Sequence, residues 1–180
     1  LVEMTMLLRN TREMLVRLCS SPGVQVLIMS TRKRDLVSKL LQGIPCWLSA
    51  EHGHVVRLSN EDNAPWEVVR SKTDYLESLE NTQWFESIAH IFHHYGSRTP
   101  GSLVEVTPVS VSLHFDDADR NYAVSIAKQL MSTLSETIGG FPIVSHLGRR
   151  SVDVIHYSVG KSAAVKLAIA KLTGGDGGDG

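Results

Sequence analysis

The chain has 180 residues, of which 42% are hydrophobic and 21% are charged, an ordinary composition for a globular domain. Its formal net charge of -1 gives no general attraction to nucleic acid or to an anionic membrane surface, so we expect neither as a partner. No apolar run approaches the roughly 20 residues of a transmembrane helix. Cys19 and Cys46 lie in apolar contexts and are expected to be free thiols, which favours a reducing, cytoplasmic location.

The first sixty residues alternate between helix and strand patterns. Leucines at helical spacing predict an amphipathic helix before the turn residues 21–23. Residues 24–29 form a continuous apolar run of strand length, typical of a strand covered on both faces. A basic, helix-like run follows, and then two short strands are expected at residues 46–50 and 54–58. This alternation favours an α/β fold.

The remainder of the chain begins with the polar, weakly patterned residues 59–78. We then expect a helix over 84–95, strands at 103–106 and 109–115, a long helix over 118–137, a strand pair at 142–146 and 152–156, and a helix over 160–172. Neither end alone supplies enough strands for a sheet. We therefore predict an α/β core formed by residues 1–58 and 151–180, with an α+β unit inserted at residues 59–150.

Two motifs in the inserted region have a simple structural explanation. His90, His93 and His94 have a spacing that can hold zinc on one helical face, but no convincing acidic ligand accompanies them, so we expect surface or half-buried histidines. Asp117-x-Asp119 follows an apolar strand, as in phosphotransferases that use an aspartate nucleophile. Arg120 follows at once, and acidic residues at a helix N-terminus explain this stretch better.

The C-terminal "GDGGDG" matches a dinucleotide-binding fingerprint by letter only. It follows a helix and opens none within this sequence, so we reject that interpretation. Asp176 and Asp179 are three residues apart in a glycine-rich stretch, and carboxylate oxygens suit Mg²⁺. The alternative to a Mg²⁺ site is a flexible chain terminus without a binding role.

Two residues at strand-to-helix junctions indicate an anion site. Ser30 ends the apolar strand and precedes the basic run, and Lys161 begins a helix. A lysine there opposes the helix dipole, which is unfavourable unless an anion or carboxylate lies nearby. In an α/β frame with an insertion between them, a hydroxyl and an ammonium at such junctions predict a phosphate site at the sheet edge.

Six stretches in order resemble the trehalose-6-phosphate phosphatase family of the haloacid-dehalogenase-like superfamily, over nearly the whole chain. They are "VLIMSTRKRDLV", "LSAEHGHVVRL", "YGSRTPGSLVEV", "VSLHFDDADRNYAVSIAKQL", "SVDVIHYSVGKSAAV" and, weakly, "GGDGGDG". "AEHG" is the most specific single match. The resemblance implies a haloacid-dehalogenase-like, Rossmann-type core with an inserted cap, and hydrolysis of trehalose 6-phosphate with Mg²⁺ through an aspartyl-phosphate.

The resemblance also assigns roles to residues of this chain. Ser30 and Lys161 would hold and neutralise the transferring phosphoryl group, and Asp176 and Asp179 would face Mg²⁺. The substrate side, toward the sugar, would comprise Arg32, Glu51, His52, Gly53 and Glu105. A glycosyltransferase-type trehalose-phosphate synthase domain is the partner that such a chain would have.

The chain departs from the family pattern in several places. The motif that carries the aspartate nucleophile is expected before residue 1. Basic family residues are replaced by Thr107, Asp116 and Ile155, and glycines by Thr31 and Ser162. Each lost charge-assisted hydrogen bond to phosphate costs about 1.5–3 kcal/mol.

These departures leave three hypotheses. The first is a phosphatase-like domain with impaired catalysis and a structural or regulatory role. The second is an active phosphatase whose nucleophile lies outside these residues. The third is an α/β domain that binds another sugar or a protein.

Overall fold

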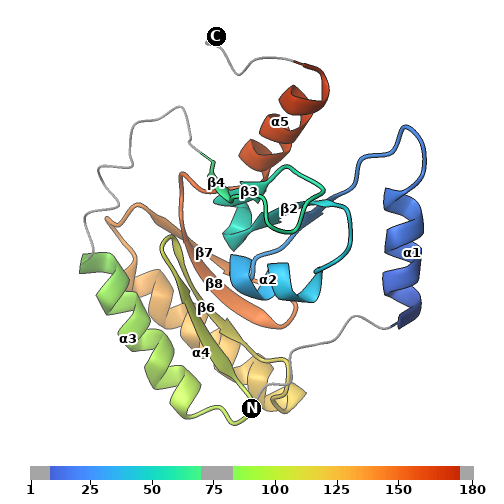
Figure 1. Cartoon of the computed structure of the whole chain (residues 1–180). Coiled ribbons are helices and arrows are strands. Elements are labelled where there is room, and N and C mark those ends of the chain that lie inside the picture. The colour runs from blue at the N-terminus through green and yellow to red at the C-terminus, as the bar shows by residue number, and fades with distance from the viewer. Residues whose placement is uncertain (1–8, 70–82, 175–180) are drawn as a thin grey trace. The chain divides into compact units, whose positions relative to one another are not determined.

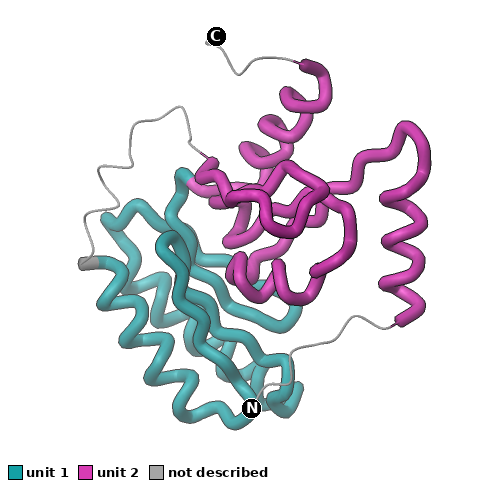
Figure 2. Tube along the Cα trace, viewed as in Figure 1, with its two compact units in different colours: residues 1–2, 73–158 teal, residues 3–72, 159–180 magenta. Residues whose placement is uncertain are grey.

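The structure is a computed structural model that describes residues 9–69 and 83–174. The chain divides into two compact units (Figure 2). We call residues 3–72 with 159–180 the core unit, and residues 73–158 with 1–2 the inserted unit. No helix in the described ranges is both long and apolar enough to cross a membrane.

The described residues of the core unit form a four-stranded sheet and three α-helices (Figure 1). In chain order its elements are α1 (Arg9–Cys19), β1 (Leu27–Met29), α2 (Arg34–Leu40), β2 (Trp47–Ala50), the short turn η1 (Glu51–Gly53), β3 (Val55–Arg57), β4 (Glu67–Val68) and α5 (Lys161–Leu172). The strand order is β1-β2-β3-β4. β1 and β2 are parallel, whereas β3 and β4 each pair antiparallel with the preceding strand.

Both faces of this sheet are covered by apolar contacts. On one face, side chains of α1 and α2 pack with Leu48, Ala50 and Val55. On the other, Ala164 and Ala168 of α5 pack in a cluster with strand residues such as Val56. Burial on both faces explains why the strands read as apolar runs rather than as alternating patterns. Cys46 is buried and Cys19 is half-buried, and both are free thiols as expected.

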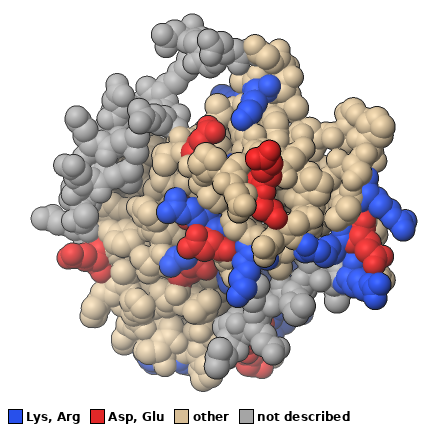
Figure 3. All heavy atoms as spheres, viewed as in Figure 1, with Lys and Arg blue, Asp and Glu red and all other residues tan. Residues whose placement is uncertain are grey.

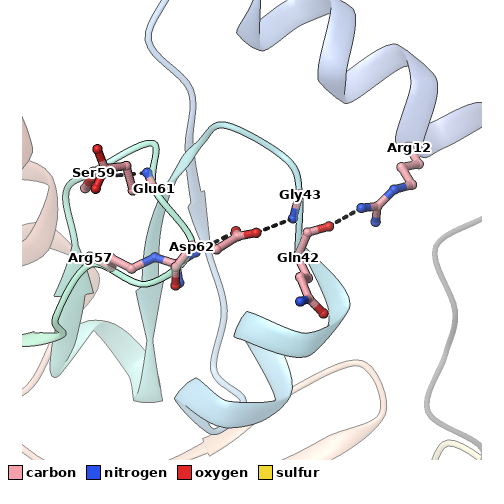
Figure 4. A network of polar contacts seen from close by, with 7 residues as sticks. All are labelled: Arg12, Gln42, Gly43, Arg57, Ser59, Glu61 and Asp62. Carbon is pink, nitrogen blue, oxygen red and sulfur yellow. Dashed lines mark hydrogen bonds and ion pairs between the residues drawn. The ribbon is translucent and has the colours of Figure 1, made fainter.

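A buried arginine joins the end of β3 to the loop that follows it (Figure 4). Arg57 is 2% exposed, donates to the carbonyl of Asp62 and places Nη2 3.7 Å from Asp62 Oδ1. Asp62 Oδ2 also accepts from Gly43 N at 2.7 Å, and Arg12 of α1 donates to the carbonyl of Gln42. The carboxylate of Asp62 therefore ties the loop after β3 to the end of α2 and compensates a buried charge.

We expect Asp62→Ala to lower the free energy of unfolding by about 2 kcal/mol. The change leaves the Arg57 guanidinium without its carboxylate and the Gly43 N–H without its acceptor. Urea unfolding measures the loss, and Glu61→Ala is the control because Glu61 is exposed and bonds only through its backbone. Equal midpoints for the two variants would contradict this account of the network.

Within its described residues, 83–158, the inserted unit forms an antiparallel sheet with two helices. Its elements are α3 (Gln83–Ser97), β5 (Leu103–Thr107), β6 (Ser110–His114), α4 (Arg120–Thr137), β7 (Ile143–Leu147) and β8 (Ser151–His156). The strand order is β5-β6-β8-β7, with every pair antiparallel. Side chains of α3 and α4 pack on one face, against residues such as Val111, Leu113 and Val154.

The structure moves both predicted unit boundaries. The sequence placed them after residues 58 and 150, whereas the units divide after residues 72 and 158. The short strand β4 pairs with β3 and keeps residues up to 68 in the core sheet. β8 lies between β6 and β7, so residues 151–156 belong to the inserted sheet.

The simple explanations for two motifs of the inserted unit are confirmed. His90, His93 and His94 are exposed, as expected of surface histidines. Asp119 is the N-cap of α4, where its Oδ1 accepts from Tyr122 N at 2.9 Å. A carboxylate at this position satisfies an otherwise unpaired backbone donor of the first turn.

His156, at the end of β8, is a buried titratable group. It is 0% exposed, and its Nδ1 accepts from Ser158 N at 3.3 Å and lies 2.6 Å from Ser158 Oγ. Its Nε2 has no hydrogen-bond partner in the described part of the chain. Burial lowers the pKa of His156 below its ordinary value because the charged form loses its hydration.

This lowered pKa predicts how stability depends on pH. The unfolded chain takes up the proton near pH 6.5 and the folded chain only at lower pH, so His156 stabilises the fold above pH 6.5 and loses that contribution as pH falls below it. Below pH 6.5, we expect the free energy of unfolding of His156→Asn to fall less steeply with decreasing pH than that of the wild type. The difference in slope is up to about 1.4 kcal/mol per pH unit. Burial also lowers the pKa of His54, so His54 contributes to the pH dependence of stability equally in the wild type and in the variant. Parallel pH profiles for both proteins would contradict this role.

Candidate functional site

Ser30 follows β1 at the carboxyl edge of the core sheet. Its N–H donates to the carbonyl of Ser49 on β2 at 2.8 Å, which continues the parallel pairing by one residue. Its Oγ accepts from Arg32 N at 3.1 Å. A hydroxyl that accepts from a backbone N–H keeps its own proton for donation, so Ser30 can donate to an anion at this edge.

The turn η1 follows β2 at the same edge and has a left-handed backbone. The φ angles of Glu51, His52 and Gly53 are +52°, +59° and +95°. Non-glycine residues rarely adopt this region, at a cost of about 1–2 kcal/mol each. Such strain persists only where the surrounding contacts hold it, and it concentrates at functional sites.

Backbone and carboxylate hydrogen bonds join this turn to the loop after Ser30. Glu51 N donates to the carbonyl of Arg32 at 3.0 Å, and Glu51 Oε1 accepts from Arg34 N at 3.3 Å. Arg34 is the first residue of α2, so the carboxylate lies against the positive end of that helix. The Ser30–Arg32 loop is therefore fixed by Glu51, itself only 5% exposed.

The far end of the same turn lies against the start of α5. A Cβ added to Gly53 would lie 2.8 Å from the carbonyl oxygen of Gly160 and 3.0 Å from the Cα of Lys161. Only a glycine permits this approach with this φ. Lys161 is the first residue of α5, whose first turn contains no acidic residue. The turn thus connects the Ser30 loop with the lysine that the sequence paired with it.

A histidine beside the turn is held toward its neutral form. Burial lowers the pKa of His54, with the nearby Glu51 carboxylate acting in the opposite direction. The backbone N–H of His54 donates to the carbonyl of Glu51 at 3.0 Å, and this hydrogen bond closes the turn.

Comparison with known proteins decides the family. The trehalose-phosphatase family model matches residues 3–177. The chain belongs to the trehalose-phosphatase family. A relative, the probable α,α-trehalose-phosphate synthase [UDP-forming] 11 of Arabidopsis thaliana, is 30% identical over 88% of this chain, but the match spans only 18% of that protein. The chain therefore covers about a fifth of the length of such a relative.

Solved structures with the same fold support the family assignment. The C-terminal domain of the Candida albicans trehalose-6-phosphate phosphatase matches with a TM-score of 0.71 and 25% identity, covering 89% of this chain and 53% of that one. The C-terminal domain of the Candida albicans trehalose synthase regulatory protein matches with a TM-score of 0.60 at 21% identity, over the same shares, which indicates the fold alone. The predicted haloacid-dehalogenase-like α/β core with an inserted α+β unit is confirmed.

The other predicted site residues belong to the inserted unit or lie outside the described part. Asp176 and Asp179 fall beyond residue 174, outside the described residues. Glu105 belongs to the inserted unit, on the sheet face opposite to its helices. Cross-strand pairing places it in one row with Ser112, Asp153 and His146, which we call the polar row.

Sequence reasoning missed three members of the polar row. Asp153 accepts from Ser151 Oγ at 2.8 Å, so the row has its own hydrogen bonding. The alternation of polar and apolar residues along β6 and β8 was the available signal, because residues paired across strands share a face. Finding the row required the register of four strands.

We expect Gly53→Ala to destabilise the protein by about 2–3 kcal/mol, because the methyl group meets the Gly160–Lys161 backbone and the left-handed φ disfavours any side chain. Gly23→Ala is the matched control: its φ is +74° and a Cβ there meets nothing within 4 Å, so about 1 kcal/mol is expected from φ alone. Thermal and urea unfolding compare the two variants, and an equal cost would contradict the close approach.

Proposed function

We propose that this chain is the phosphatase-type domain of a trehalose-pathway protein, and that it binds trehalose 6-phosphate but turns it over poorly. The observation that carries the proposal is the turn Glu51–Gly53, which hydrogen-bonds to the Ser30–Arg32 loop at one end and meets the start of α5 at the other. These contacts support an anion site shared by three segments.

The phosphate end of the ligand is the part that this edge recognises. The Ser30 hydroxyl donates a hydrogen bond to the phosphate, and the exposed Lys161 ammonium supplies a positive charge. The N-terminus of α5 adds the positive end of its helix dipole. Glu51 is a positioning residue. Its backbone N–H fixes the Ser30–Arg32 loop, and its carboxylate accepts from the first backbone N–H of α2.

Replaced cations on the inserted unit support impaired turnover. Thr107 stands where the family pattern has lysine, and its hydroxyl bonds to Ser110 Oγ at 2.7 Å within the β5–β6 turn. Ile155 and Asp116 stand where the pattern has arginine, and Asp116 reverses the charge. Three fewer cations weaken the binding of a charge-rich transition state more than that of the ground state.

The proposal includes no step through a metal ion. Mg²⁺ stays a prediction, because its expected ligands Asp176 and Asp179 lie outside the described residues and the described ones form no cluster of ligating side chains. When bound, such a cation polarises the phosphoryl group and neutralises its charge.

We also propose that the chain functions joined to, or together with, a trehalose-phosphate synthase domain in a regulatory or structural role. The similarity to the Arabidopsis synthase, of which this chain matches less than a fifth, supports a longer parent. An impaired phosphatase domain retains ligand binding, which is sufficient for sensing the product of such a synthase.

Calorimetric titration of the chain with trehalose 6-phosphate tests the binding. We expect Lys161→Ala to weaken binding about tenfold or more through the loss of one charge-assisted hydrogen bond. Lys166→Ala is the control, because Lys166 is exposed on the same helix and was assigned no role. Equal affinities for wild type and Lys161→Ala, or no binding at all, would overturn the proposal.

A second arm of the titration tests the replaced cations. Asp116→Arg is expected to tighten binding about tenfold, whereas Asp117→Arg changes the net charge equally at the next exposed position and should have a smaller effect. The active phosphatase is the competing hypothesis. Steady release of phosphate by the full-length parent at rates typical of enzymes, abolished by Lys161→Ala, would replace the impaired domain with an active one.

A further inference from the structure

A pocket in the inserted unit is lined by none of the residues assigned above to the phosphate edge or the polar row. It has a volume of about 530 Å³ and is formed by the N-terminal half of α4, the β7–β8 turn and the end of β6. Its charged lining consists of Arg120, Lys128, Arg149 and Arg150. A volume of this size suits a small molecule.

The charge of the lining has one sign only. The described residues that line the pocket include four cations and no carboxylate. On the face of the molecule drawn in Figure 3, by contrast, basic and acidic side chains lie interspersed. The side chains of Arg120, Lys128 and Arg149 make no hydrogen bond or ion pair with the described part of the chain. Free cations that repel one another around a hollow favour an anion there.

The backbone fixes the two segments that carry these cations. Arg120, Val124 and Lys128 are spaced four residues apart and form one ridge of α4. Facing them, the β7–β8 turn is closed by a hydrogen bond from Gly148 N to the carbonyl of Ser151 at 2.8 Å. The turn is also anchored to β6, because Phe115 N donates to the carbonyl of Arg150 at 2.8 Å and Arg150 Nη2 donates to the carbonyl of Asp116 at 2.6 Å.

The floor between the ridge and the turn is apolar. Phe115, Ala123 and Ala127 are buried there, and the exposed Val124 and Leu147 lie at the sides. An apolar floor below a basic rim suits a ligand with an anionic end and an apolar or planar part. Arginine guanidinium groups bind phosphate in a bidentate manner and also stack on planar rings.

We propose that this pocket is a second ligand site, for a small phosphorylated molecule that bears two anionic groups and a planar or apolar part. The site is independent of the phosphate edge of the core unit, since the two share no residue. A ligand here engages α4 and the β7–β8 turn together.

Titration of the whole chain with three probes tests the site: pyrophosphate as the anion alone, adenosine as the planar part alone, and ADP as both. We expect ADP to bind more tightly than pyrophosphate and adenosine to bind least. Binding of ADP should weaken several-fold between low salt and 0.5 M salt because exposed charges are screened. Adenosine binding as tight as ADP binding, or ADP no tighter than pyrophosphate, would overturn the assignment.

Substitutions locate the binding. Lys128→Ala and Arg149→Ala should each weaken ADP binding about tenfold, and Lys128→Arg should retain it. Both residues are exposed, and unchanged circular dichroism confirms folding. Lys161→Ala should leave ADP binding unchanged, and Arg149→Ala should leave trehalose 6-phosphate binding unchanged, so failure of either site is seen separately. ADP binding that is lost in Lys161→Ala and kept in Arg149→Ala would place the ligand elsewhere and refute this site.

Discussion

The structure of the core unit depends on one close approach of two backbones, that of Gly53 to Gly160 and Lys161. Residues 53 and 160 are separated by the whole inserted unit, yet the contact leaves no room for a side chain. It fixes the first turn of α5 against the carboxyl edge of the sheet. In α/β folds, ligands bind at this edge of the sheet. Loss of this contact would detach the start of α5 from the turn that binds the Ser30–Arg32 loop.

The elements of the fold could be predicted from the sequence because their signals are local. The apolar run before Ser30, the helical spacing before Cys19 and the alanine-rich stretch after Gly160 each fall on the expected element. An insertion was also predicted, because neither end alone was expected to supply enough strands for a sheet. That reason was wrong: β1 to β4 all lie within residues 27–68, and the last helix instead covers the second face of their sheet.

Other features could not be predicted because they depend on contacts distant in sequence. The strand β4 has only two residues, both exposed, and exists through its pairing with β3. β8 was predicted as a strand but was assigned to the core unit, because its sequence pattern does not indicate which sheet it joins. The left-handed Glu51–His52 backbone contradicts the local preference of both residues and is held by tertiary contacts. Likewise, the basic residues around the α4 pocket come from two segments that only the fold brings together.

We propose that the Ser30 loop, the Glu51–Gly53 turn and the start of α5 form one anion site. Titration with inorganic phosphate, followed by NMR at the backbone amides of Arg32, Gly53 and Lys161, tests it most directly. A single site predicts that the three amides shift together and saturate with one common dissociation constant. Shifts confined to one segment, or three unrelated constants, would contradict the claim.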